Sequence, residues 1–339
     1  MLCAVFDKKK KLKLTEIPTP KINDDEVLVK VDVCGVCGSD LVKIKNNLVS
    51  EGTVLGHEVV GTIVETGNHV RKWTSSQKVV VAHHVPCLNC YFCKSGNFSM
   101  CSQFKNTNLI PGGFAEYIKV SKAHLEQTTF LIPKGTVSDY EIALTEPLAC
   151  CLRALRKAEV STNNSVLICG LGSIGIMLGL LCIEKGAQTF GADLLKNRIT
   201  LAKEMNAIHN GNLANPPELK SWILNKTEGR GVDIIFLASG SDKSMDDAIS
   251  LVRSGGKIIV FSSISKEKGF YNNEIYYREL TVSGSYSPSP VTLKDAYQLI
   301  ITGKIKLKNL ITDVVSLKEL PGQIEKCYEN SSVKMMVEA

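Results

Sequence analysis

The chain has 339 residues, of which 44% are hydrophobic and 22% are charged, and its formal net charge is +6 at pH 7. This length predicts two domains rather than one small core, and the composition is typical of a soluble globular protein. The positive charge is diffuse apart from the run Lys8–Lys11, which we interpret as a solvated hairpin tip. The charge therefore argues against a nucleic-acid-binding protein.

The region from residue 1 to about 148 consists largely of short apolar runs separated by glycine, proline and asparagine. They predict an irregular β-rich domain. Met1–Phe6 is apolar but short, and Asp7 and several lysines follow at once, which does not resemble a targeting signal. We therefore expect a cytoplasmic protein. The strands that we predict in this region are Val27–Val33, Val59–Glu65, Lys78–Ala82 and Ala115–Val120.

Candidate metal ligands are dispersed through the same region, namely Cys37, His57 and Glu146, and Glu58 directly follows His57. A zinc ion bound by one thiolate, one imidazole and carboxylate or water keeps a position open for a substrate, as a catalytic site requires. Each residue also has a purely structural explanation. Cys37 could be a core thiol, His57 a hydrogen-bonded buried histidine, and Glu146 a carboxylate at a helix start.

Four further cysteines, Cys87, Cys90, Cys93 and Cys101, fall within a stretch of 15 residues. Four thiolates at this spacing can bind one tetrahedral Zn²⁺, with Zn–S bonds of about 2.3 Å. The residues between them are mostly polar and predict a loop that the metal holds together. Disulfides are the alternative, but they are disfavoured because cytosolic thiols stay reduced.

From about residue 149 short apolar strands alternate with helical patterns, as in Asn197–Met205 and Ser244–Arg253. This alternation predicts a parallel sheet with helices on both faces. The apolar run Val166–Ile183 is almost long enough to cross a membrane, but its glycines have strand-turn-helix spacing, so no membrane span is expected. The predicted strands are Val166–Cys169, Thr189–Ala192, Asp233–Ala238, Lys257–Phe261 and Leu280–Ser283. After Pro288 we expect a helix at Leu293–Ile301 and a last strand at Val333–Val337.

A glycine-rich turn follows the first of these strands and consists of Gly170, Leu171, Gly172, Ser173, Ile174 and Gly175. Such a turn lets a dinucleotide pyrophosphate approach the backbone at a helix N-terminus. Asp193 ends the next strand, where a carboxylate accepts hydrogen bonds from ribose hydroxyls and repels the additional phosphate of NADP. NAD is therefore favoured, although Arg198 lies nearby and Asp193 could instead be a helix cap.

Together these motifs resemble the zinc-dependent medium-chain dehydrogenases, the superfamily of alcohol, sorbitol and threonine dehydrogenases. The resemblance implies an α/β protein with two domains. Residues 1–148 and 287–339 would form a GroES-like catalytic domain with a structural zinc lobe at about 87–101. Residues 149–286 would form a Rossmann NAD-binding domain. The motifs occur in family order in the segments Cys34–Asp40, Gly56–Glu58, Cys87–Cys101, Gly113–Tyr117, Glu146–Ala149 and Gly170–Gly175.

The resemblance also implies two Zn²⁺ ions per subunit. Cys37, His57, Glu58 and Glu146 would bind the catalytic ion, Glu146 directly or through water, and the four clustered cysteines would bind the structural ion. Asp40 would orient the ligand histidine, and Ser39 would take the alcohol proton. The expected reaction is hydride transfer from a secondary alcohol, of the polyol, polyol phosphate or hydroxy amino acid type, to NAD. The expected assembly is a homodimer or homotetramer.

Two departures from the family pattern limit the substrate prediction. Val42 stands where many members have a relay histidine, and Tyr286 is not preceded by the arginine of sorbitol dehydrogenases. The first departure is similar to galactitol-1-phosphate dehydrogenase, in which case Lys43 and Lys45 could meet a phosphate. The alternatives left open are an NADP-dependent alcohol dehydrogenase or carbonyl reductase and, in a different class, a zinc-ribbon binding protein without catalysis.

Overall fold

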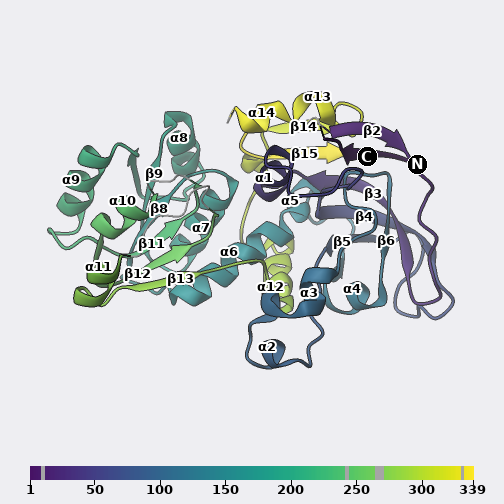
Figure 1. Ribbon diagram of the computed structural model, residues 1–339, viewed down its shortest axis with the longest axis horizontal. Coiled ribbons are helices and arrows are strands. Elements are labelled where there is room, and N and C mark those ends of the chain that lie inside the picture. The colour runs from purple at the N-terminus through teal and green to yellow at the C-terminus, as the bar shows by residue number, and fades with distance from the viewer. Residues whose placement is uncertain (9–11, 241–243, 264–270, 330–331) are drawn as a thin grey trace. The chain divides into compact units, whose positions relative to one another are not determined.

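The computed structural model describes residues 1–8, 12–240, 244–263, 271–329 and 332–339 (Figure 1). The chain forms two compact units, which are described separately. Unit 1 consists of Met1–Ala149 and Ser289–Ala339, and unit 2 consists of Cys150–Pro288. In the described part of the chain no helix is both long and apolar enough to span a membrane. The middle of the expected basic hairpin tip, Lys9–Lys11, lies outside the described residues.

Unit 1 is built on a seven-stranded sheet. Six of its strands follow the order β14-β15-β3-β4-β5-β7, and the seventh, β6, pairs with β3. The central strands are rich in valine, and their fully buried side chains form the core of the unit together with the hairpin of β1 and β2. The bounds of these strands are β1 Leu2–Phe6, β2 Leu12–Glu16, β3 Val27–Gly35, β4 Glu58–Thr66, β5 Lys78–Ala82, β6 Tyr117–Val120, β7 Thr129–Leu131, β14 Asp313–Ser316 and β15 Met335–Glu338.

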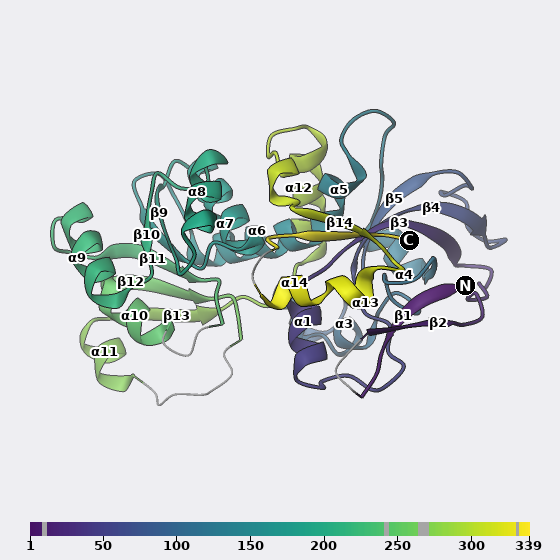
Figure 2. The ribbon, with the colours of Figure 1, turned by 90° about the horizontal axis from the view of Figure 1, so that it is seen from above.

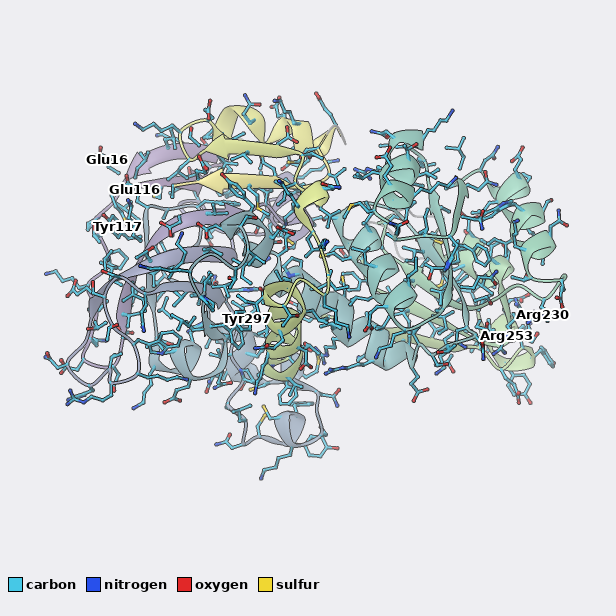
Figure 3. The ribbon with its side chains drawn as sticks, turned by 180° about the vertical axis from the view of Figure 1, so that it is seen from behind. Glu16, Glu116, Tyr117, Arg230, Arg253 and Tyr297 are labelled. Carbon is cyan, nitrogen blue, oxygen red and sulfur yellow. The ribbon has the colours of Figure 1, made fainter. Side chains whose placement is uncertain are left out.

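The helices of unit 1 are short, apart from α12, and lie around this sheet. The hydroxyl of Tyr297 in α12 donates to the carbonyl of Leu131 at 2.5 Å, and its ring stacks on Phe130, which anchors α12 to β7 (Figure 3). The bounds are α1 Gly38–Lys45, α2 Tyr91–Lys94, α3 Ser102–Asn106, α4 Lys122–Gln127, α5 Asp139–Ala143, α12 Pro290–Ile301, α13 Leu320–Gln323 and α14 Glu325–Tyr328, with 3₁₀ turns at Phe98–Met100 and Lys308–Leu310. The long helix α6, Thr145–Ala158, runs from unit 1 into unit 2.

Unit 2 is a six-stranded, entirely parallel sheet with the order β10-β9-β8-β11-β12-β13. Helices α7 and α8 lie on one face, and α10 and α11 lie on the other (Figure 2). This is the doubly wound arrangement that the alternation of strands and helices predicts. The bounds are β8 Ser165–Cys169, β9 Gln188–Asp193, β10 Asn210–Leu213, β11 Val232–Leu237, β12 Val252–Val260, β13 Thr281–Gly284, α7 Ser173–Glu184, α8 Lys196–Glu204, α9 Pro216–Lys226, α10 Ser244–Leu251 and α11 Asn272–Tyr277.

Several element boundaries differ from the sequence prediction for local reasons. Helix α10 ends at Leu251, because the chain enters β12 at Val252 and reaches its regular pairing with β11 only after a register shift. Helix α12 begins at Pro290 and not at Leu293, since Ser289 caps it and proline is well suited to the first helical turn. The expected loop between the clustered cysteines contains the single turns α2 and Phe98–Met100.

Candidate metal centres and nucleotide turn

The antiparallel pairing of β3 and β4 brings the first set of predicted ligands together. Gly35, at the end of β3, is paired with Glu58, at the start of β4. Cys37 follows two residues after Gly35 and caps α1, while His57 directly precedes Glu58. The ligand atoms of Cys37, His57 and Glu58 all lie within 4.8 Å of one another. A sheet register therefore places a thiol, an imidazole and a carboxylate around one point.

The imidazole of His57 is held by a fully buried carboxylate. Asp40, on the first turn of α1, places Oδ1 3.3 Å from Nδ1 of His57. Burial by itself would raise the pKa of Asp40, but the adjacent His57 outweighs this and lowers that pKa below its usual value. Because Nδ1 faces Asp40, Nε2 is the nitrogen left for a metal.

The carboxylate of Glu58 is paired with a buried ammonium group. Lys334, just before β15, places Nζ 2.5 Å from Oε2 of Glu58 and donates a hydrogen bond to the carbonyl of Val36 at 2.9 Å. A side chain at Gly35 would collide with this carboxylate, so the glycine leaves the room that Glu58 needs. Within the described residues both oxygens of Glu58 are buried and accept no well-directed hydrogen bond. Such oxygens, beside a thiol and an imidazole, fit a bound zinc ion.

Two other predicted residues are placed differently. Glu146 is buried in the first turn of α6, but its carboxylate is not part of the close group of ligand atoms, so its position matches a helix-start carboxylate. Ser39 is exposed on the first turn of α1, and Cys37, rather than Ser39, is the N-cap residue. Ser39 is therefore not the helix cap, and its hydroxyl is available for another role.

Sequence reasoning missed three residues of this site: Lys334, His83 and His84. The signal for Lys334 was its charge within the otherwise apolar run Val333–Val337. The signal for the histidines was their position between a strand and the cysteine-rich segment. The ring of His83 lies 4.4 Å from that of His57, and the ring of His84 lies 3.7 Å from that of His83.

The four clustered cysteines converge on a second centre, in the lobe that carries α2 and projects from the rest of unit 1 (Figure 1). Sγ of Cys93 lies 3.9 Å from Sγ of Cys87 and 3.6 Å from Sγ of Cys90. A tetrahedron with Zn–S bonds of about 2.3 Å has edges of about 3.8 Å, so these separations fit one zinc ion.

The alternative of disulfides in this lobe is wrong, because all twelve cysteines of the chain are free thiols. Backbone groups also favour thiolates here. Burial raises the pKa of the Cys101 thiol, but N–H groups of Cys87 and Phe104 outweigh it and lower that pKa to about 6. Cys101 therefore offers a deprotonated sulfur to a metal, whereas burial raises the pKa of the neighbouring Cys93 thiol to about 12.

The glycine-rich turn lies between β8 and α7 in unit 2, as the sequence predicts. Gly170 has a φ of 97°, which a residue with a side chain rarely adopts, and Gly172 is the N-cap of α7. A side chain at Gly175 would overlap the carbonyl of Gly170, so this glycine allows the helix to approach the strand. Ser173 and Ile174 form the first turn of α7, whose N-terminus favours a phosphate.

Asp193 ends β9 beside this turn. Its carboxylate accepts hydrogen bonds from the N–H groups of Leu171, at 2.6 Å, and Leu195, at 2.9 Å. Leu195 is the N-cap residue of α8, so Asp193 is not the helix cap. Nη1 of Arg198 lies 3.9 Å from Oδ2 of Asp193 and faces Gly172. The structure therefore brings a cation next to the acidic residue that the sequence associates with ribose.

Two family models match the chain: the alcohol dehydrogenase GroES-like domain over residues 23–132, and the zinc-binding dehydrogenase domain over residues 173–302. The chain belongs to the zinc-binding alcohol dehydrogenase family, and it is an oxidoreductase that acts on a CH–OH group. It is 31% identical to the sorbitol dehydrogenase of Bacillus subtilis (strain 168), over 99% of this chain and 97% of that protein.

Two further similar proteins are named as dehydrogenases of phosphorylated polyols. The D-arabitol-phosphate dehydrogenase of Enterococcus avium is 30% identical over 96% of this chain and 93% of that protein. The crystal structure of galactitol-1-phosphate dehydrogenase from Escherichia coli is 25% identical, has a TM-score of 0.86, and is matched over 100% of both chains.

These matches confirm the predicted family, the GroES-like and Rossmann fold class, and the predicted class of enzyme. The cofactors are zinc and a nicotinamide dinucleotide, and the two clusters are compatible with a catalytic and a structural zinc. A zinc-ribbon binding protein would leave the matched dehydrogenase domains unexplained, so we do not retain that alternative.

Proposed function

We propose that this enzyme oxidises a secondary hydroxyl group of a polyol or polyol phosphate and transfers the hydride to NAD. The observation that carries the proposal is the cluster of Cys37, His57 and Glu58. Asp40 contacts His57 of this cluster, and Lys334 contacts Glu58. Two relatives are named as dehydrogenases of sorbitol and of D-arabitol phosphate, and these compounds are a polyol and a polyol phosphate. The reaction converts CH–OH and NAD⁺ into C=O, NADH and one proton.

We assign the binding of the catalytic zinc to Cys37, His57 and Glu58. When bound, zinc acts as a Lewis acid that lowers the pKa of an alcohol hydroxyl. The four-cysteine lobe would hold the structural zinc, whose closed coordination leaves no room for substrate. Glu146 is assigned only an indirect role, through water or through the helix start, because its carboxylate lies outside the group of close ligand atoms.

The chain's own residues would orient the site and receive the proton. Asp40 fixes the direction of His57 through Nδ1. Ser39 is exposed one residue before Asp40, where its hydroxyl can accept the proton of the substrate hydroxyl. Val42 is 42% exposed and cannot continue a relay, so the proton would pass from Ser39 to the cofactor ribose or to water.

We assign the nucleotide to the glycine-rich turn and its ribose to Asp193. Two backbone hydrogen bonds fix the carboxylate next to the turn, and its charge repels the additional phosphate of NADP. The adjacent Arg198 is the feature that supports the NADP alternative, because a guanidinium group binds phosphate well. Comparing kcat/KM for the two cofactors decides between these alternatives.

A phosphorylated substrate is supported by one further residue. Lys43 is half-buried on α1, and its charge acts on Asp40, His83 and His84, so it faces the same part of the site. Lys45, two residues later, is exposed. If Lys43 binds a phosphate, Lys43→Ala raises KM for polyol phosphates and leaves KM for free polyols unchanged.

We propose a homodimer or homotetramer in the cytoplasm. Strand β13 is the open edge of the unit 2 sheet and exposes Val282, so it can pair with a second copy. Twelve free thiols fit a reducing compartment. Light scattering of the purified protein measures the assembly.

The first experiment is a spectrophotometric assay of NADH formation. The panel contains simple alcohols, threonine, polyols, inositols and polyol phosphates, each with NAD⁺ and with NADP⁺. Activity on polyols or their phosphates that is lost in Cys37→Ser supports the proposal. Absence of activity in protein that holds only one zinc ion per chain would overturn the assignment of the catalytic centre.

A further inference from the structure

A continuous stack of rings connects the two candidate metal centres inside unit 1. The rings of His57 and His83 are 4.4 Å apart, those of His83 and His84 are 3.7 Å apart, and those of His84 and Phe104 are 5.0 Å apart. Phe104 forms the small buried cluster of the lobe together with Cys93 and Cys101. Each step of this path is a direct packing contact.

The middle of the stack is attached to the lobe by hydrogen bonds. Nδ1 of His84 lies 2.5 Å from the carbonyl oxygen of Thr107, the residue that ends α3. The Thr107 hydroxyl accepts from the N–H of Val85 at 3.0 Å and donates to the carbonyl of Phe104 at 3.1 Å. The segment that carries both histidines is therefore attached to α3 and to Cys101, the cysteine that caps it.

The other end of the stack depends on packing. Nδ1 of His83 is buried and has no hydrogen-bond partner among the described residues, so packing against His57 and His84 contributes to holding the ring. The backbone of His83 is held separately, because its carbonyl accepts from Nε2 of His124 at 2.9 Å. The ring of His83 can thus transmit a displacement of His84 to His57.

His57 needs such a support. The contact with Asp40 through Nδ1 sets the direction of the imidazole within its plane. A single contact at one nitrogen does not by itself fix the tilt of the ring plane. The face of His83, inclined by 41° to His57, limits this tilt. Residues that orient a ligand histidine commonly change metal affinity by about 10- to 100-fold when they are removed.

We propose that His83 and His84 are positioning residues that couple the four-cysteine lobe to His57, so that a zinc ion in the lobe strengthens zinc binding at Cys37, His57 and Glu58. This inference rests on the proposed metal-binding role of those three residues. It gives the lobe an effect on the catalytic centre in addition to its effect on stability. The coupling is mechanical and passes through close-packed rings that have little free space.

The test uses the full-length zinc-loaded protein and measures the transfer of zinc to a chromophoric chelator. The wild type should hold two zinc ions per chain and release them in two phases. His84→Ala should accelerate release from the Cys37 centre by about tenfold. His84→Phe, which keeps the ring, should release zinc within about twofold of the wild-type rate. His69→Ala is the matched control, since His69 is an exposed histidine of the same unit and its Nδ1 lies 3.8 Å from Oδ1 of Asp25.

A spectroscopic measurement separates positioning from a general loss of stability. With Co²⁺ in place of zinc, the absorption bands of the Cys37 centre should shift in His84→Ala and not in His69→Ala. Phe104→Leu, which keeps an apolar side chain but removes the ring, should act in the same direction and serves if His84→Ala does not fold. Two zinc ions per chain with unchanged release and unchanged bands would overturn the coupling alone. One zinc ion per chain in the wild type would overturn the proposed function, and the coupling with it.

Discussion

The two metal centres of unit 1 are built in opposite ways. The lobe takes its four sulfur atoms from a single stretch of 15 residues, and the surrounding backbone supplies much of the remaining support. The Cys37 centre takes its ligands from the ends of two paired strands, and one supporting residue, Lys334, comes from the far end of the chain. A local centre depends on a loop, whereas a dispersed centre depends on the whole sheet.

The difference extends to buried charge. The Cys37 centre places Asp40, Glu58 and Lys334 in the interior, and each of these charges is costly without its partners. In the described part of the lobe the buried polar residues are Cys93, Cys101 and Ser99, and none of them carries a carboxylate or an ammonium group. The dispersed centre should therefore be the more sensitive of the two to single substitutions.

The largest effect is expected for Cys37→Ala. Loss of this ligand should reduce kcat/KM by at least about 10³-fold, because the metal contributes several kcal/mol to the reaction. Metal analysis should find one zinc ion per chain, held by the lobe, and an unchanged circular dichroism spectrum. Cys327→Ala changes a half-buried cysteine outside both clusters and should keep wild-type activity. Full activity of Cys37→Ala with one zinc ion would show that the dispersed centre is not catalytic.

Removal of the ammonium group tests the cost of the buried charges. Lys334→Met should destabilise the zinc-free protein by about 3–5 kcal/mol, since it leaves the Glu58 carboxylate buried and unpaired. Zinc binding should reduce this loss, because the metal then neutralises the same carboxylate. Urea unfolding of both forms measures the difference.

The double variant Glu58→Gln/Lys334→Met is the control for that measurement. It removes both charges, so it should recover much of the stability of the zinc-free protein. If the two substitutions were simply additive, the ion pair would have no special role in this centre.

The nucleotide site lies between the two extremes, because its turn is local and its acidic residue is 18 residues beyond the last glycine. Asp193→Ser removes the carboxylate and leaves Arg198 in place. The ratio of kcat/KM for NADP⁺ to that for NAD⁺ should rise by about tenfold, which corresponds to about 1.4 kcal/mol. An unchanged ratio would mean that Asp193 accepts hydrogen bonds from backbone N–H groups but does not select between the two cofactors.

The smallest effect is expected at Asp233, a carboxylate that hydrogen bonds hold without any metal. It gives a reference against which the larger effects at the metal centre can be compared. Asp233 in β11 accepts hydrogen bonds from the N–H and hydroxyl of Ser165 and from Nε of Arg253, at 2.7, 2.6 and 2.6 Å. Burial would raise the pKa of Asp233, but these hydrogen bonds lower it below its usual 3.8. Its stabilising effect is therefore complete above about pH 4 and is lost as the pH falls through the lower, folded-state value.

Asp233→Asn should reduce the free energy of unfolding by about 1 kcal/mol at neutral pH, after allowance for partial solvent exposure. The difference from the wild type should disappear in acid, where the wild-type carboxylate is itself protonated. Thermal unfolding across a pH series measures it. A difference that is the same at all pH values would assign the effect to shape and not to charge.

The sequence was sufficient wherever the determinants are close together in the chain. The four cysteines, the glycine-rich turn and the alternation of strands and helices are short-range patterns, and the structure contains each of them. The family motifs also placed Cys37, His57 and Glu58 in one centre, because a β-strand pairing fixes which residues meet.

The tertiary structure decided what depends on distant segments. Only the packing of β15 beside β3 brings Lys334 to Glu58, and only the close approach of α3 to the end of β5 stacks His84 on Phe104. It also separates Glu146 from the close ligand group and brings Arg198 next to Asp193. Short-range patterns determine which chemical groups a segment offers, whereas three-dimensional packing determines which of those groups meet and which charges are buried together.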